Sequence, residues 1–111
     1  MNEHAAAIAA FNAEQYRDAL LAFEARWHTE RSETLRALIL LANAMNQLRL
    51  GLAEGPRRNL ARAAALLDVA PTHYEGIALA PLRAHVATLR ALLPEGAAAP
   101  KWDQVPRCLI E

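Results

Sequence analysis

The stretch FNAEQYRDALLAFEARW, residues 11–27, decides the fold of this chain. Its apolar residues recur at intervals of three and four positions, which is the spacing of one face of an α-helix. This stripe consists of Tyr16, Ala19, Leu20, Phe23 and Trp27. Because Asn12 and Glu14 interrupt the pattern, the spacing predicts a turn at 12–14 between a first helix over about 3–11 and a second over about 14–28. The aromatic side chains expected to pack in the core are Phe11, Tyr16, Phe23 and Trp27.

The following segment predicts the central helix of the fold. Ser32 or Glu33 opens it, and Gly51 ends it just after Leu50. Residues 35–45 are apolar on nearly all sides, so we expect neighbours on most of the helix surface. A helix that ends at glycine commonly places that residue in the left-handed conformation, which predicts a positive φ for Gly51.

The second half of the chain predicts two more helices and an irregular end. Proline is tolerated in a first turn, so Gly55-Pro56 marks the start of a fourth helix, which stops before Pro71. Residues 72–76 are expected to form a loop, and a fifth helix follows from Pro81 to Pro94. Residues 94–100 form a small-residue linker, and the last segment carries apolar anchors without periodicity. These anchors are Trp102, Val105, Leu109 and Ile110, and we expect them to order the segment by contact.

The composition favours an all-α protein. Hydrophobic residues make up 54% of the 111 positions, but aromatic residues only 5%, and alanine is abundant. We therefore predict a single compact bundle of about five helices with a non-helical C-terminal segment. The predicted division is a helical bundle domain over 1–93 and a linker and C-terminal segment over 94–111. A folded chain of this size should expose roughly 6,000 Å².

The charge and the cysteine content indicate which kinds of partner and which cellular compartment the sequence favours. Twelve basic and twelve acidic residues give a formal net charge of zero, which does not favour nucleic acid or an anionic membrane as partner. The single cysteine, Cys108, cannot form an intrachain disulfide, and apolar runs such as 37–42 are far below the roughly 18 residues of a membrane span. We expect a cytoplasmic protein without cofactor.

The spacing within residues 11–27 also resembles a known family. It follows the pattern FN-x-x-x-Y-x-x-A-H-E-x-L-E-x-x-W of the bacterial domain of unknown function 309 family, whose activity is unassigned. The likeness extends over roughly residues 7–93. The positions that carry it are Phe11, Asn12, Tyr16, Ala19, Glu24, Trp27, Gly51, Gly55 and Gly76. The resemblance implies that these serve as packing or turn residues in a small helical protein.

This chain departs from the family pattern at the ionisable positions. Leu20 and Leu21 stand where the family has a His-Glu pair, and Gln47 stands where it has a histidine. If the pair performs chemistry in the family, the resemblance implies a vestigial member; if the pair is structural, leucines fill the same volume.

Two polar clusters are candidates for a site. Glu24 lies on the shoulder of the apolar stripe and should need a partner, for which Asn46 and Arg49 of the central helix are candidates. We interpret this possible interhelical cluster as a structural contact that sets helix register, with a residual ligand or proton-transfer carboxylate as the alternative. The second cluster is a possible anion patch of Arg49, Arg57, Arg58 and Arg62.

Other motifs for catalysis are missing from the sequence. Glu24 and His28 have the i, i+4 spacing of metal ligands, but no third ligand is evident. No Walker loop, dinucleotide fingerprint or paired-cysteine zinc motif occurs. The sequence therefore favours a non-enzymatic interaction or scaffold protein with a protein partner or a second copy of itself. An anion or nucleic-acid binding module that uses the arginine cluster is the alternative.

Overall fold

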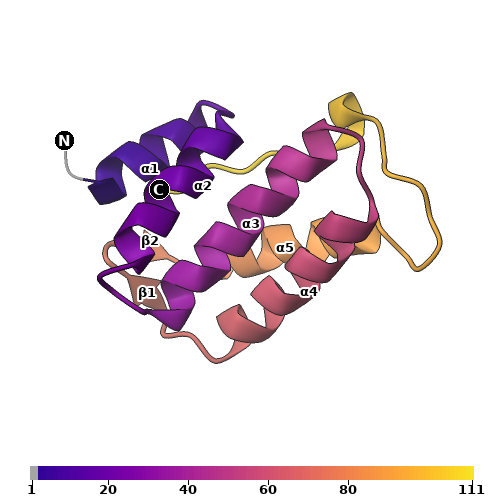
Figure 1. Cartoon of the computed structure of the whole chain (residues 1–111). Coiled ribbons are helices and arrows are strands. Elements are labelled where there is room, and N and C mark those ends of the chain that lie inside the picture. The colour runs from indigo at the N-terminus through magenta and orange to yellow at the C-terminus, as the bar shows by residue number, and fades with distance from the viewer. Residues whose placement is uncertain (1–2) are drawn as a thin grey trace.

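The computed structural model describes residues 3–111, whose backbone is mostly helical (Figure 1). The helices are α1 Glu3–Asn12, α2 Tyr16–Trp27, α3 Glu33–Arg49, α4 Glu54–Asp68 and α5 Ala80–Ala91, with a two-stranded hairpin, β1 His73–Tyr74 and β2 Ile77–Ala78, and one 3₁₀ turn, η1 Trp102–Gln104. The prediction of an all-α bundle of about five helices is confirmed.

Helix α3 lies at the centre, with α1 and α2 on one side, α4 on the other and α5 behind (Figure 1). Consecutive helices pack on one another along the whole chain. The buried positions of α3 are Thr34, Leu35, Ala37, Leu38, Leu40, Leu41, Ala42, Ala44, Met45 and Leu48. The described residues expose 5934 Å², close to the expected area for a single core.

Both ends of α3 follow from the sequence. The Ser32 hydroxyl accepts a hydrogen bond from the Leu35 backbone N–H at 3.2 Å, which satisfies a donor that the first turn leaves free. At the other end Gly51 has a φ of +82°, as predicted. The Gly51 N–H donates to the Leu48 carbonyl, and the Leu52 N–H donates to the Gln47 carbonyl, both at 3.0 Å. These two bonds close the helix in a Schellman motif.

The turn between α1 and α2 uses the same motif without a glycine. Glu14 has a φ of +61°; its N–H donates to the Phe11 carbonyl at 3.0 Å, and the Gln15 N–H donates to the Ala10 carbonyl at 2.9 Å. A left-handed residue cannot continue into a helix. Helix α2 therefore begins at Tyr16, and the predicted start at residue 14 is wrong.

Residues 73–78 form a β-hairpin where we predicted a loop at 72–76. His73 pairs with Ala78, and Tyr74 pairs with Ile77. The two turn residues, Glu75 and Gly76, have φ values of +47° and +83°, and positive φ at both positions is what a type I′ turn requires. Ile77 is 2% exposed, so the hairpin delivers an apolar side chain to the core.

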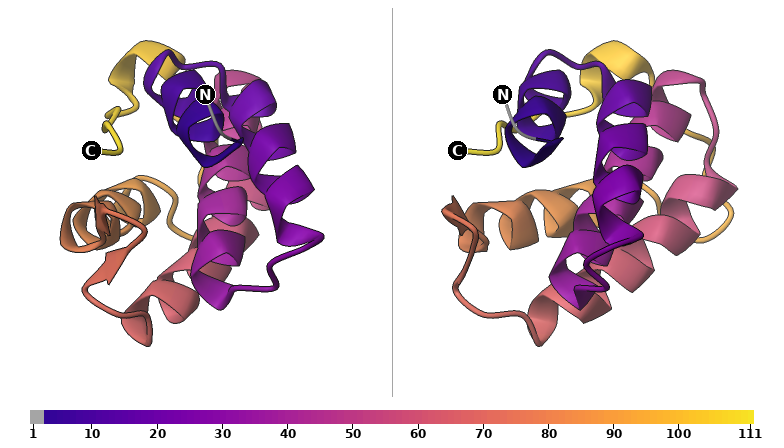
Figure 2. Two further views of the ribbon diagram at one scale, coloured as in Figure 1. Left: turned by 90° about the vertical axis from the view of Figure 1, so that its left-hand side faces the viewer. Right: turned by 60° about the vertical axis from the view of Figure 1, so that its left-hand side comes forward.

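The C-terminal segment lies between α1 and α5 (Figure 2). Val105 and Ile110 are buried in the common core, whereas Leu109 is 57% exposed. The prediction that contact orders this segment is therefore confirmed for Val105 and Ile110 but not for Leu109. Residues 94–111, predicted to lie apart from the bundle domain, contribute Val105 and Ile110 to the same core. No helix among residues 3–111 has the length and apolarity needed to cross a membrane.

Candidate functional site

The aromatic residues of α1 and α2 differ in how deeply they are buried. Phe11, Tyr16 and Phe23 are fully buried, as expected for core aromatic residues. Trp27 is only partly buried, and the Arg31 guanidinium lies 4.2 Å above its ring. Leu20 packs partly against the core, while Leu21 is 50% exposed. One side of α2 thus belongs to the core, and its C-terminal end reaches the surface.

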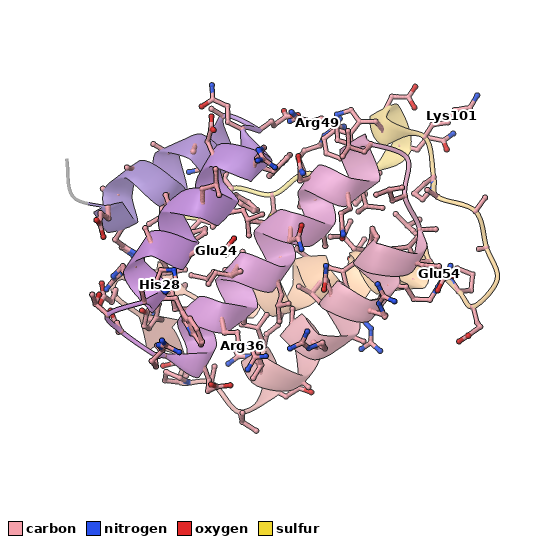
Figure 3. All side chains as sticks on the ribbon, viewed as in Figure 1. Glu24, His28, Arg36, Arg49, Glu54 and Lys101 are labelled. Carbon is pink, nitrogen blue, oxygen red and sulfur yellow. The ribbon has the colours of Figure 1, made fainter. Side chains whose placement is uncertain are left out.

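The structure does not join Glu24 to Asn46 and Arg49 through any hydrogen bond or ion pair within residues 3–111. Glu24 is exposed and lines a hollow with Arg36 of α3. The reason is register: α2 and α3 are joined by a short turn, so residues at equal distances from that turn face each other. Figure 3 shows Arg36 and Arg49 at opposite ends of α3, with Glu24 on the same face of the molecule.

Arg49 instead lies beside the N-terminal turn and the C-terminal segment. Its guanidinium donates to the Glu14 carbonyl and lies 5.1 Å from the Tyr16 ring centre and 5.5 Å from that of Trp102. Arg107 lies 4.0 Å from the Trp102 ring centre. Cations over aromatic rings are attracted to the negative face. Arg49 is therefore one part of a clamp around the C-terminal segment.

The other members of the predicted anion patch, Arg57, Arg58 and Arg62, belong to α4 and differ in their contacts. Arg57 donates to the Leu93 carbonyl at 3.1 Å, to the Pro94 carbonyl at 3.1 Å and to the Ala97 carbonyl at 2.9 Å, and it pairs with Glu54. Arg58 is exposed, and Arg62 lines the same hollow as Arg36. The four arginines do not form one surface patch, because Arg49 and Arg57 are used to hold the residues that follow α5.

A surface groove crosses α2, α3 and α4, and we call it the arginine groove. It comprises a hollow of about 300 Å³ and an adjoining one of about 240 Å³, which share Arg36 and Arg62. Its lining residues are Glu24, Trp27, Arg36, Ile39, Leu40, Arg62, Ala65 and Leu66. Within residues 3–111 the side chains of Arg36 and Arg62 have no hydrogen bond, ion pair or aromatic contact. Two cations thus stand unpaired beside apolar side chains.

A second polar cluster, which we call the Arg26 network, joins α1, α2 and the hairpin. The Arg26 guanidinium donates to His4 Nδ1 at 2.6 Å and to Glu30 Oε2 at 2.8 Å, and it pairs with Glu75. The Tyr74 hydroxyl donates to Glu30 Oε1 at 2.9 Å. Burial, followed by the bond to Glu30, raises the pKa of Tyr74. Sequence reasoning missed this network, although Arg26 and Glu30 have the i, i+4 spacing of a helical ion pair.

The remaining titratable side chains offer no activated nucleophile. Burial raises the pKa of Cys108 to about 11, which keeps its thiol protonated near neutral pH. Burial also raises the pKa of Tyr16 to about 12 and lowers that of His85. His28 is exposed. In the described part of the chain no three His, Cys, Asp or Glu side chains are grouped so that they could hold a metal ion.

No protein-family model matches this chain, and neither a curated protein nor a solved structure matches it. The resemblance to the domain of unknown function 309 family therefore stays a prediction from the sequence.

Proposed function

We propose that this chain is a non-catalytic protein-interaction domain, and that its arginine groove binds an acidic amphipathic segment of a partner protein. The observation that carries the proposal is the pair of guanidinium groups of Arg36 and Arg62, which share one groove and have no partner within residues 3–111. Arg26 and Arg57 are engaged by carboxylates or carbonyls, whereas the other arginines whose side chains have no partner within residues 3–111, Arg17, Arg58 and Arg90, do not line the groove.

The chemistry of the groove fits carboxylates next to apolar side chains. A guanidinium presents donors in a fixed plane, which suits bidentate binding of a carboxylate. Trp27, Ile39 and Leu66 provide apolar surface on both sides of the arginine pair. A segment that carries acidic residues on one side and apolar residues on the other would satisfy both parts, because burial of the apolar residues adds to the ionic contacts.

A protein segment fits this surface better than a polyanion. A run of phosphates would leave Trp27, Ile39 and Leu66 without an apolar partner, whereas a protein segment can cover them. The chain carries no net charge to attract a nucleic acid. Arg49 is occupied by the Glu14 carbonyl and the Trp102 ring, and Arg57 by carbonyls of the loop after α5. Two of the four arginines proposed for an anion-binding module are therefore already engaged within the chain.

The test is a selection of random peptides displayed on phage against the immobilised full chain, followed by affinity measurements with the selected synthetic peptides. The double charge reversal Arg36→Glu/Arg62→Glu should weaken binding by about tenfold or more, since each lost ionic contact contributes on the order of 1 kcal/mol. Selected sequences should combine Asp or Glu with large apolar residues.

A matched control keeps the change in net charge and moves it away from the groove. Arg90 and Lys101 are both exposed and lie outside the groove, so Arg90→Glu/Lys101→Glu should bind the selected peptides like the parent. The proposal would be contradicted if the groove variant bound the peptides as tightly as the parent does, or if the selected peptides lacked acidic residues. Circular dichroism of both variants shows whether each remains folded.

A further inference from the structure

We propose that the partner segment in the arginine groove carries a basic residue, Lys or Arg, beside its acidic ones, and that Glu24 of α2 binds this basic residue. The inference rests on the proposed function of the groove and adds to it the direction in which the segment lies. The basic residue would lie over α2, and the acidic residues over α3 and α4.

The carboxylate of Glu24 has no partner in its own chain. Within residues 3–111 it takes part in no hydrogen bond or ion pair. Four other glutamates pair with an arginine, namely Glu14, Glu30, Glu54 and Glu75. Glu24 lines the hollow of about 300 Å³ together with Arg36 and Arg62, but no ion pair joins it to either of them in the described chain. Opposite charges thus border one hollow without contact, and a segment that carries both charges would satisfy both.

The charge of the groove changes between its two ends. The hollow of about 300 Å³ reaches α2 and contains Glu24 besides the two arginines. The adjoining hollow of about 240 Å³ contains no carboxylate among the described residues; it is lined by Arg36, Arg62, Ala65 and Leu66. Arg31 lines neither hollow, and its guanidinium lies over the Trp27 ring. A segment that crosses from α2 to α4 therefore meets a carboxylate first and two guanidinium groups afterwards.

A purely acidic segment would cover Glu24 without offering it a cation. Covering removes water from the carboxylate, which costs free energy unless a donor or a cation replaces that water. An acidic residue at the same point would add repulsion between like charges. Glu24 therefore disfavours segments in which every charge is negative, and this selects for Lys or Arg at the α2 end.

Helix packing sets the distance between the basic and the acidic residues. Figure 3 shows Glu24 and Arg36 on the same face of the molecule, and the helices that carry them, α2 and α3, pack on each other. The axes of packed helices lie about 8–10 Å apart. Since an extended chain advances about 3.3 Å per residue, the basic residue should lie about two to four positions from the first acidic one in an extended segment.

The experiment exchanges the charges of Glu24 and its partner. A peptide selected on the full chain is synthesised with an acetylated N-terminus in two forms, one with its basic residue and one with glutamate at that position. The parent chain should bind the basic form about tenfold more tightly. Glu24→Gln should reduce this preference, and Glu24→Lys should reverse it. Because Glu24 is exposed, both variants should keep the parent fold, which circular dichroism checks.

Glu95→Lys is the matched control, because it makes the same change in net charge at an exposed glutamate that lines neither hollow. It should prefer the basic form as the parent does, since salt at about 0.15 M screens charges that lie more than about 8 Å apart. The inference is overturned if the selected peptides lack a basic residue, if Glu24→Lys keeps the preference of the parent, or if Glu95→Lys reverses it as well.

The charge reversal Arg36→Glu/Arg62→Glu tests the groove separately with the same two peptides. If this variant binds both forms as tightly as the parent does, the proposed function fails and this inference fails with it. If the variant binds both forms weakly while the Glu24 variants keep the preference of the parent, the proposed function stands and only the role of Glu24 is wrong.

Discussion

The Arg26 network and the arginine groove place the same residue type in opposite circumstances. Arg26 contacts His4, Glu30 and Glu75, and its side chain is only 15% exposed. Arg36 and Arg62 share a groove on the neighbouring face and have no such partners in the described chain. The guanidinium chemistry is identical, so the difference comes from what the fold places beside each residue. Satisfied arginines hold elements together, and unsatisfied ones are available to a partner.

Helix α2 contributes to both regions, and two of its aromatic residues, Phe23 and Trp27, separate core from groove. Phe23→Ala should cost about 3–4 kcal/mol, because Phe23 is fully buried, whereas Trp27→Ala should cost about half as much because Trp27 lies at the surface. Trp27→Ala should also weaken the binding of the selected acidic peptides. Chemical denaturation and peptide titration give the two readouts. A larger loss of stability for Trp27→Ala would contradict this division of α2.

Removal of an arginine from each region should separate stability from binding. Arg26→Ala leaves Glu30 and Glu75 without their cation; because these carboxylates are 40% and 41% exposed, we expect a loss of only about 1–2 kcal/mol. Arg36→Ala/Arg62→Ala should change stability by less than about 0.5 kcal/mol and still weaken peptide binding. Thermal melts of the two variants, side by side, test the comparison. Equal destabilisation would mean that Arg36 and Arg62 also serve the fold.

A smaller change tests the edge of the Arg26 network. Tyr74→Phe removes the hydroxyl that donates to Glu30 and keeps the ring near Arg26, so it should cost about 0.5–1.5 kcal/mol. The double variant Arg26→Ala/Tyr74→Phe should lose less than the sum of the two single changes, since both act on Glu30. Chemical denaturation of the parent, the two single variants and the double variant measures this double-mutant cycle. Strict additivity would show that the two contacts are independent.

The smallest expected effect is the pH dependence of stability. It comes from His85, which belongs to neither the Arg26 network nor the arginine groove. Burial lowers the pKa of His85 in the folded state, so the unfolded chain binds more protons once the pH falls below about 6.5. Stability should therefore decrease as the pH falls from that value and level off below the folded pKa. The dependence should be weaker in His85→Leu, whereas His28→Gln, a change at an exposed histidine, should melt like the parent. Melting temperatures over this pH range check the prediction.

Part of the candidate site was visible in the sequence. Arg62 was recognised as a cation near the start of the fourth helix, and Trp27 as the end of the apolar stripe. Their common groove was not predictable, because it depends on Arg36, which a short turn brings opposite Glu24. The hairpin had a local signal in Glu75-Gly76 between Tyr74 and Ile77, although it lacks the usual Asn-Gly or Asp-Gly.

The sequence by itself determined the helices and most of their ends. Apolar spacing set the inner face of α2, and Ser32 and Gly51 set the ends of α3, because these signals act within a few residues along the chain. Only the tertiary structure decided which polar groups meet. Asn12 binds the backbone of Ile110, 98 positions away, and Arg36 remains unpaired, because helix register and the path of the C-terminal segment depend on non-local packing that local periodicity does not encode.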